Sequence, residues 1–171
     1  MFGRLKQLLG IDGKQPSGDG QVYLAGLKIG DVREVHKIES ASYLTPWTAS
    51  AFERACEDDQ EEFWVARLAG KIVGYAGFRK EPELGHIVNV TVHPDYRRRG
   101  IATLLLRHLF NRMRVTGYDR TYLEVRETNL AAQSLYRKLG FRPVRTVKGY
   151  YFDTGEDAVI MEFVLTAEPK R

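Results

Sequence analysis

The sequence predicts a mixed α/β domain built around one central sheet. Two observations support this fold class: β-rich runs alternate with helical runs along the chain, and one strand-helix-strand unit implies a parallel pair of strands. The 171 residues suit a single domain, and a hydrophobic fraction of 43% is enough for a core. The predicted order is a strand, two helices, three strands, a helix, a strand, a helix and two strands, which makes about seven strands and four helices.

The first half of the chain begins with a predicted strand at residues 21–27. A helix follows, with Asp31 as a possible N-cap and apolar residues at helical spacing. After a turn at Pro46, a second helix has Thr48 as its possible cap. Residues 62–80 form a predicted β-hairpin, because two β-rich runs flank a short loop that contains glycine.

The second half contains a strand, a helix, a strand, a helix and a final β-hairpin, at residues 85–94, 101–115, 120–127, 129–140, 141–152 and 156–165. The strand before the first of these helices and the strand after it are the pair that we expect to be parallel. Gly117 and Gly140 are expected to end the two helices.

Residues 1–20 form a predicted N-terminal appendage and linker, since glycine, proline, serine and aspartate dominate residues 12–20. Its short apolar stripe leaves an interfacial or docking helix as an alternative to a loose appendage. The domain is expected at 21–166, with a tail at 167–171. No apolar run approaches the roughly 20 residues of a membrane span, no secretion signal is evident, and the single Cys56 allows no internal disulfide. We therefore expect a cytoplasmic protein without a transmembrane segment.

The charge pattern argues against a dedicated nucleic-acid binder. The net charge is only +4, and 26 positive and 22 negative side chains are mixed along the chain. The mild positive excess suits an anionic small ligand. The four histidines show no metal-ligand spacing with cysteine or carboxylates, so we expect no metal. The sequence does not indicate an oligomeric state.

The segment "HPDYRRRGIATLL", at 93–105, combines arginines with a glycine at a strand-to-helix junction. The first N–H groups of a helix lack partners, and the helix dipole adds positive potential, so such a terminus binds phosphate. Gly100 permits close approach of a ligand, and Ala102 leaves the first turn uncrowded. Neither a Walker loop nor a dinucleotide fingerprint is present. The pattern favours a phosphate or diphosphate site over a solvated turn.

The motif Arg97-x-x-Gly100-x-Ala102 resembles the Arg/Gln-x-x-Gly-x-Gly/Ala motif of the GNAT superfamily of acetyl-coenzyme-A-dependent N-acetyltransferases. The strand before it and "LEVRETNLAAQSLYRKLGF" after it also resemble that superfamily. With "YYFDTGEDAVIM", the pattern resembles the RimI-type branch, which acetylates the N-terminal amine of a ribosomal protein. The resemblance spans about residues 22–165. It implies a GNAT-like fold, acetyl-CoA as co-substrate, and direct transfer to a protein N-terminus.

The resemblance also implies the residues that bind the cofactor. The backbone of Val90, Thr91 and Val92 is expected to pair with the pantetheine arm. Backbone N–H groups are expected to hold the pyrophosphate, within the segment Arg97, Arg98, Arg99, Gly100, Ile101, Ala102 and Thr103. Asn129 is either only a helix cap or also a contact to the cofactor arm.

Glu124 corresponds to the family's general base, and Tyr136 corresponds to its general acid, which protonates the departing thiolate. The alternatives are a salt-bridged strand glutamate and a core tyrosine. An N-terminal amine has a pKa near 8 and lysine a pKa near 10.4, so deprotonating lysine at neutral pH costs about 3 kcal/mol more. A single carboxylate base is thus better suited to an N-terminal amine.

Trp47, Tyr150 and Tyr151 are expected to frame the peptide site, with simple packing as the alternative. Glu156 and Asp157 either hold the last loop or meet a basic peptide. Two other functions stay open: acetylation of a small-molecule amine, and binding of acetyl-CoA without catalysis.

Overall fold

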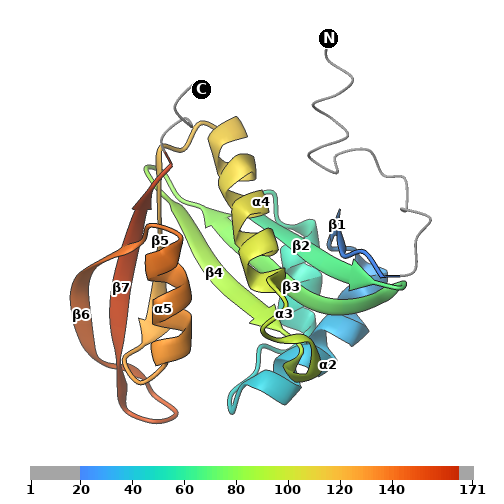
Figure 1. The fold of residues 1–171 in the computed structure, drawn as a ribbon, viewed down its shortest axis with the longest axis horizontal. Helices are drawn as coiled ribbons and strands as arrows, with labels where there is room; N and C mark the ends of the chain where they lie inside the picture. The colour runs from blue at the N-terminus through green and yellow to red at the C-terminus, as the bar shows by residue number, and fades with distance from the viewer. Residues whose placement is uncertain (1–19, 166–171) are drawn as a thin grey trace.

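The computed structural model describes residues 20–165, which form a seven-stranded mixed sheet with four α-helices (Figure 1). The predicted order of strands and helices is confirmed. The elements are β1 (Tyr23–Gly26), η1 (Ile29–Asp31), α2 (Val32–Ser42), α3 (Ala49–Glu57), β2 (Glu61–Leu68), β3 (Lys71–Lys80), β4 (Gly85–Val92), η2 (Pro94–Tyr96), α4 (Ile101–Val115), β5 (Arg120–Arg126), α5 (Leu130–Lys138), β6 (Arg142–Tyr151) and β7 (Glu156–Val164). The predicted appendage at 1–20, except for its last residue, and the tail at 167–171 lie outside the described residues.

The strands are ordered β1-β2-β3-β4-β5-β7-β6, and every neighbouring pair is antiparallel except β4–β5. This parallel pair, which the sequence predicts, joins only Gly85 to Thr121 and His86 to Tyr122. Beyond these residues the two strands diverge (Figure 1). We call this divergence the β4–β5 fork. Within the described residues, the β4 edge that faces the fork has no strand partner after His86.

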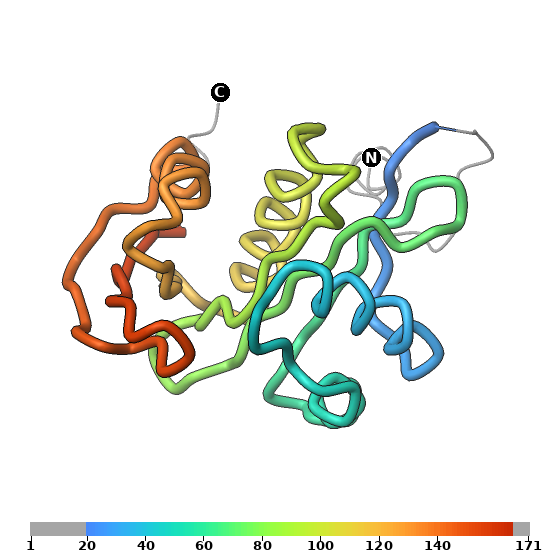
Figure 2. Tube along the Cα trace, turned by 90° about the horizontal axis from the view of Figure 1, so that it is seen from below, coloured from blue at the N-terminus to red at the C-terminus, as the bar shows by residue number. Residues whose placement is uncertain are grey.

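The helices cover both faces of the sheet (Figure 2). One core lies between the sheet and α2 and α3, and it contains Val65 and Tyr75. The other lies between the sheet and α4 and α5, and it contains Ala66 and Ala76. Neighbouring residues enter different cores because successive strand side chains point to opposite faces. The fork therefore lies between two separately packed cores, one on each face of the sheet.

The start of α3 follows the sequence prediction, whereas the start of α2 differs from it. Thr48 caps α3, because its hydroxyl oxygen accepts the Ala51 N–H at 3.2 Å. Asp31 stands at the N-cap position of α2, but its side chain makes no capping bond there. It accepts the Lys28 N–H at 3.2 Å and pairs with Arg67 at 2.6 Å. Asp31 is the last residue of the short turn η1, and its side chain bonds to the residue before that turn instead of capping α2.

None of the helices within residues 20–165 has the length and apolar character needed to cross a membrane.

Candidate active site

The N-terminus of α4 carries a run of unpaired backbone donors. Among the described residues, none of the N–H groups from Arg98 to Thr103 has a hydrogen-bond acceptor, and the first bond of the turn is donated by Leu104 to the Gly100 carbonyl at 3.0 Å. Gly100 has φ of 78°, a left-handed conformation that favours glycine. Six unpaired donors and the positive end of a helix dipole therefore lie within one six-residue segment, which suits an anionic group.

Two of the three arginine side chains in this loop bond to the loop's own neighbours. Arg97 Nε donates to the Val92 carbonyl at 3.1 Å, and Arg99 Nη2 donates to the Asp95 carbonyl at 3.1 Å. Arg98 is exposed and has φ of 63°, and its side chain makes no hydrogen bond within residues 20–165. The arginines thus shape the loop, and the backbone presents the donors.

The predicted pantetheine segment lies on the strand edge at the fork. The other edge of β4 pairs with β3, where Val90, Thr91 and Val92 stand opposite residues 74–76. The Thr91 hydroxyl contacts the Tyr43 hydroxyl at 3.0 Å, which anchors this part of β4 to the end of α2. An extended chain of amides pairs with such an unpartnered edge as an added strand does. Within the described residues, the three residues predicted for this role have no strand partner on the fork edge.

Asn129 caps α5, as one of the two alternatives predicts. Its Oδ1 accepts the Ala132 N–H at 3.1 Å. The amide nitrogen of the same side chain makes no hydrogen bond within the described residues. Asn129 is therefore free to cap the helix and to donate to a ligand, and the second role stays a prediction.

Glu124 and Tyr136 lie on opposite faces of the sheet. Leu123 and Val125 are buried in the core of α4 and α5, so strand alternation directs Glu124 to the face of α2 and α3. Tyr136 is buried in the α4/α5 core. Burial raises the pKa of Tyr136, and Tyr43 and Tyr151 raise it further. A reaction that used both Glu124 and Tyr136 would have to connect the two faces of the sheet.

His86 is a partner of Glu124 that sequence reasoning missed. Its Nε2 lies 2.7 Å from Glu124 Oε2, and its Nδ1 lies 3.3 Å from Glu81 Oε1. The ring stacks on Tyr122 with centroids 4.3 Å apart, and the Tyr122 hydroxyl donates to Glu81 at 3.1 Å. The strand register explains the contact. His86 pairs with Tyr122, and Tyr122 lies two residues before Glu124 and on the same face of the sheet. This contact holds the candidate base in one orientation.

Two of the predicted substrate residues lie beside Glu124. Burial raises the pKa of Tyr150, and the negative charge of Glu124 raises it further. Burial also raises the pKa of Tyr151, and Glu124 adds to that shift. The two rings stand edge to face with centroids 5.1 Å apart. The charge of Glu124 therefore acts on both tyrosines, and their contact with a peptide stays a prediction.

Trp47 is placed differently from the two tyrosines. Its ring packs against Phe52 at 5.5 Å and Phe63 at 5.9 Å between centroids, and it borders the α2/α3 core. Its backbone N–H donates to the carboxylate of buried Glu39 at 3.0 Å. The packing alternative therefore describes this ring, and a contact between Trp47 and a peptide stays a prediction.

The two carboxylates at the start of β7 hold the last loop. Glu156 pairs with Arg126 at 2.9 Å. Asp157 pairs with Lys148 at 2.5 Å and accepts the Gly149 N–H at 2.9 Å. Of the two alternatives that the sequence leaves open, the structure supports loop stabilisation. Within residues 20–165, no three histidine, cysteine, aspartate or glutamate side chains are grouped as metal ligands.

Comparisons with known proteins show the family of this chain. Residues 32–141 match the model of the Acetyltransferase (GNAT) family. A Sulfolobus acidocaldarius protein named N-alpha-acetyltransferase is 36% identical over 154 residues, covering 82% of this chain and 90% of the relative. An Escherichia coli K12 protein named [ribosomal protein bS18]-alanine N-acetyltransferase is 31% identical over 140 residues, covering 81% and 94%. The crystal structure of the ribosomal-protein-S18-alanine N-acetyltransferase from Escherichia coli superposes with a TM-score of 0.79 at 27% identity, covering 88% of this chain and 98% of that chain. The family match covers more than half of the sequence, and the chain therefore belongs to the acetyltransferase (GNAT) family.

Proposed function

We propose that this protein transfers the acetyl group of acetyl-CoA directly to the N-terminal α-amine of a protein, with a ribosomal protein as the leading candidate. One observation carries the proposal: the anion-binding loop of α4 and the candidate base Glu124 serve opposite faces of the sheet, joined by the β4–β5 fork. The names of the Escherichia coli and Sulfolobus relatives support this substrate class. A ribosomal substrate would place the reaction in the cytoplasm.

The residues of the loop and of β4 fit acetyl-CoA. The unpaired N–H groups from Arg98 to Thr103 match the oxygens of a pyrophosphate, and the backbone of Val90–Val92 matches the amides of a pantetheine arm. The unused amide nitrogen of Asn129 offers a further donor. When bound, acetyl-CoA supplies an acetyl group activated as a thioester.

Glu124 accepts a proton from the α-ammonium group of the substrate. His86 holds the carboxylate through its 2.7 Å contact. The α-amine requires about 3 kcal/mol less for deprotonation at neutral pH than a lysine side chain does, so one carboxylate suffices. Tyr136, from the other face, donates its hydroxyl proton to the departing sulfur. Its hydroxyl is protonated at neutral pH, and because burial raises the pKa of Tyr136, proton transfer to a thiolate is more uphill than from a free phenol.

A small polyamine is a less suitable acceptor. Polycations need free carboxylates, but Asp153, Glu156 and Asp157 of the last hairpin all bind cations of the chain itself. Two large apolar side chains, Leu44 and Phe152, are 84% and 99% exposed in the two neighbouring loops. Such a rim suits the residues that follow the N-terminus of a peptide.

The test is release of free thiol from acetyl-CoA in the presence of N-terminal peptides, including those of ribosomal proteins. Glu124→Gln is expected to lower kcat/KM by about 10²–10⁴-fold and to leave the Kd of CoA within about twofold. Parallel assays with polyamines, amino acids and aminoglycosides address the small-molecule alternative. Faster turnover of those amines than of every peptide would overturn the proposal. A rise in thermal stability on adding acetyl-CoA, with no turnover of any amine and no measurable effect of Glu124→Gln, would favour a binding module.

A further inference from the structure

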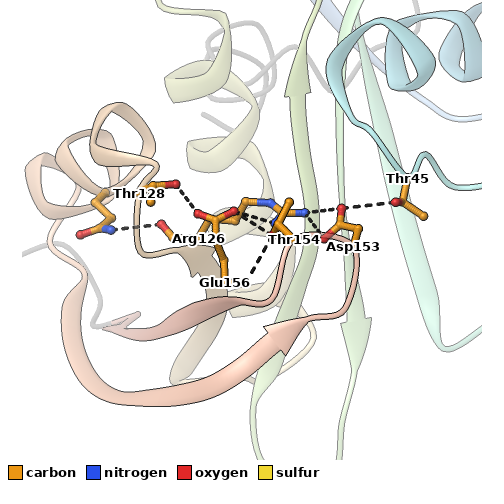
Figure 3. A network of polar contacts seen from close by, with 7 residues as sticks. Thr45, Arg126, Thr128, Asp153, Thr154 and Glu156 are labelled. Carbon is orange, nitrogen blue, oxygen red and sulfur yellow. Dashed lines mark hydrogen bonds and ion pairs between the residues drawn. The ribbon is translucent and has the colours of Figure 1, made fainter.

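Arg126, the last residue of β5, organises the loop between β6 and β7. Its Nη2 donates to Asp153 at 2.9 and 2.7 Å. Its Nη1 donates to the Thr154 hydroxyl at 2.6 Å and to Glu156 at 2.9 Å (Figure 3). Thr128, in the β5–α5 connection, donates to the same glutamate. One guanidinium thus holds two residues of a loop that is distant in sequence, together with the first residue of β7.

The same guanidinium lies over the ring of Tyr151, with its Cζ 4.0 Å from the ring centroid. Arg126 and Glu124 are two residues apart on one strand, so both side chains emerge on the same face. Burial raises the pKa of Tyr151, Arg126 lowers it, and the charge of Glu124 raises it, so the net shift is upward. Arg126 therefore holds an aromatic ring beside the candidate base.

The network also crosses to the connection between α2 and α3. Thr45 donates from its hydroxyl to Asp153 Oδ2 at 3.3 Å, the same carboxylate that Arg126 holds (Figure 3). The sequence predicts that these two loops frame the peptide site, although 108 residues separate Thr45 from Asp153. Their only recorded side-chain hydrogen bond in residues 20–165 runs through a carboxylate whose position depends on Arg126.

We propose that Arg126 is a positioning residue for the peptide amine: it sets Tyr151 beside Glu124 and fastens the β6–β7 loop against the α2–α3 loop. This inference rests on the proposed function. The guanidinium is engaged by carboxylates and by the tyrosine ring, so it acts through them and not as a contact to the cofactor. Loss of Arg126 should therefore weaken binding of the peptide amine beside Glu124 and leave binding of acetyl-CoA at the α4 loop unchanged.

The experiment compares Arg126→Lys and Arg126→Ala with the matched control Arg120→Ala. Arg120 lies on the same strand and meets Glu162 at 3.9 Å, away from the fork. Both Arg126 variants are expected to raise the peptide KM by about tenfold or more, with kcat within about threefold, because charge-assisted bonds from one guanidinium to two carboxylates are lost. The Kd of CoA should stay within about twofold. Lysine keeps the charge but has a single nitrogen in place of the planar fork, so it should recover only a minor part of the alanine defect.

A second measurement does not depend on turnover. In hydrogen–deuterium exchange, Arg126→Ala should raise exchange in residues 149–155 and 43–48, whereas Thr45→Val should raise it only in 43–48. Arg120→Ala should change neither segment. Unchanged exchange in the Arg126 variants would overturn the inference, and so would raised exchange with an unchanged peptide KM. A wild-type peptide KM in Arg126→Lys would show that only the charge of Arg126 matters, and this result would also overturn the inference. If the wild type acetylates no peptide, the proposed function fails, and the exchange data alone decide whether Arg126 fastens the loops.

Discussion

The α4 loop supports a quantitative prediction about which of its parts binds CoA. Gly100→Val places a β-branched residue at a φ of 78°, and Arg98→Ala removes an exposed charge without changing the backbone preference. A Cβ at Gly100 would meet no atom within 4 Å, so the free protein has room for it. The effect of Gly100→Val therefore comes from conformation and from the approach of the ligand.

The expected magnitudes differ by about an order of magnitude. A left-handed conformation costs an L-residue about 1–2 kcal/mol, and a branched side chain lies at the upper end of that range. With about 1.4 kcal/mol for each tenfold change, Gly100→Val should weaken CoA binding by at least roughly 10- to 30-fold. An exposed charge contributes about 0–1 kcal/mol, so Arg98→Ala should weaken it by no more than about fivefold.

Isothermal titration of CoA into each variant measures the two dissociation constants, and thermal unfolding without ligand checks that both proteins are folded. Arg98→Gly serves as the control for the backbone, because it removes the same charge and relieves the φ of 63° at that position. It should bind CoA at least as well as Arg98→Ala. The reasoning is refuted if Arg98→Ala weakens binding more than Gly100→Val does, because side-chain charges would then dominate the site.

Three further predictions follow from the described contacts. Tyr136→Phe should lower kcat roughly 10- to 100-fold without changing the Kd of CoA, and an unchanged kcat in a stopped-flow thiol assay would remove its role as acid. Burial, then the charge of Arg112, lowers the pKa of His108 from 6.5 to about 4. As the pH falls from about 6.5 to 4, the unfolded chain takes up a proton that the folded protein excludes, so the free energy of unfolding in urea should fall. Because the ring is partly exposed, solvent screening keeps the contribution of His108 below about 3 kcal/mol. His108→Gln should show a smaller fall, and an equal fall in the variant would contradict this. Gly77→Ala should destabilise the fold by about 1–3 kcal/mol, because its Cβ would lie 2.4 Å from a phenylalanine ring. The control is Gly26→Ala, whose Cβ would meet no atom within 4 Å. Equal melting temperatures for the two variants would contradict the packing argument.

The element order, the parallel pair and the α4 loop follow from the sequence, because they depend on local patterns. The α4 helix begins at Ile101 and ends at Val115, as the apolar spacing predicts. Thr48 and Asn129 cap their helices because capping is a contact over three residues. Asp31 departs from its predicted role because Arg67, 36 residues away, competes for the same carboxylate. Local rules are reliable only where no distant partner intervenes.

The donor-rich loop could be predicted from one short motif, and the family resemblance, with the candidate acid and base that it implies, from three sequence blocks in order. The side chains that surround them became known only from the folded structure. His86 reaches Glu124 through the register of β4 and β5. Arg126 reaches Asp153, 27 residues later, because the loop of the β6–β7 hairpin lies beside the end of β5. The folded structure also decided that Glu156 and Asp157 hold a loop and that the Trp47 ring packs into a core. Contacts between distant segments depend on how the sheet twists and diverges, and no local periodicity records that geometry.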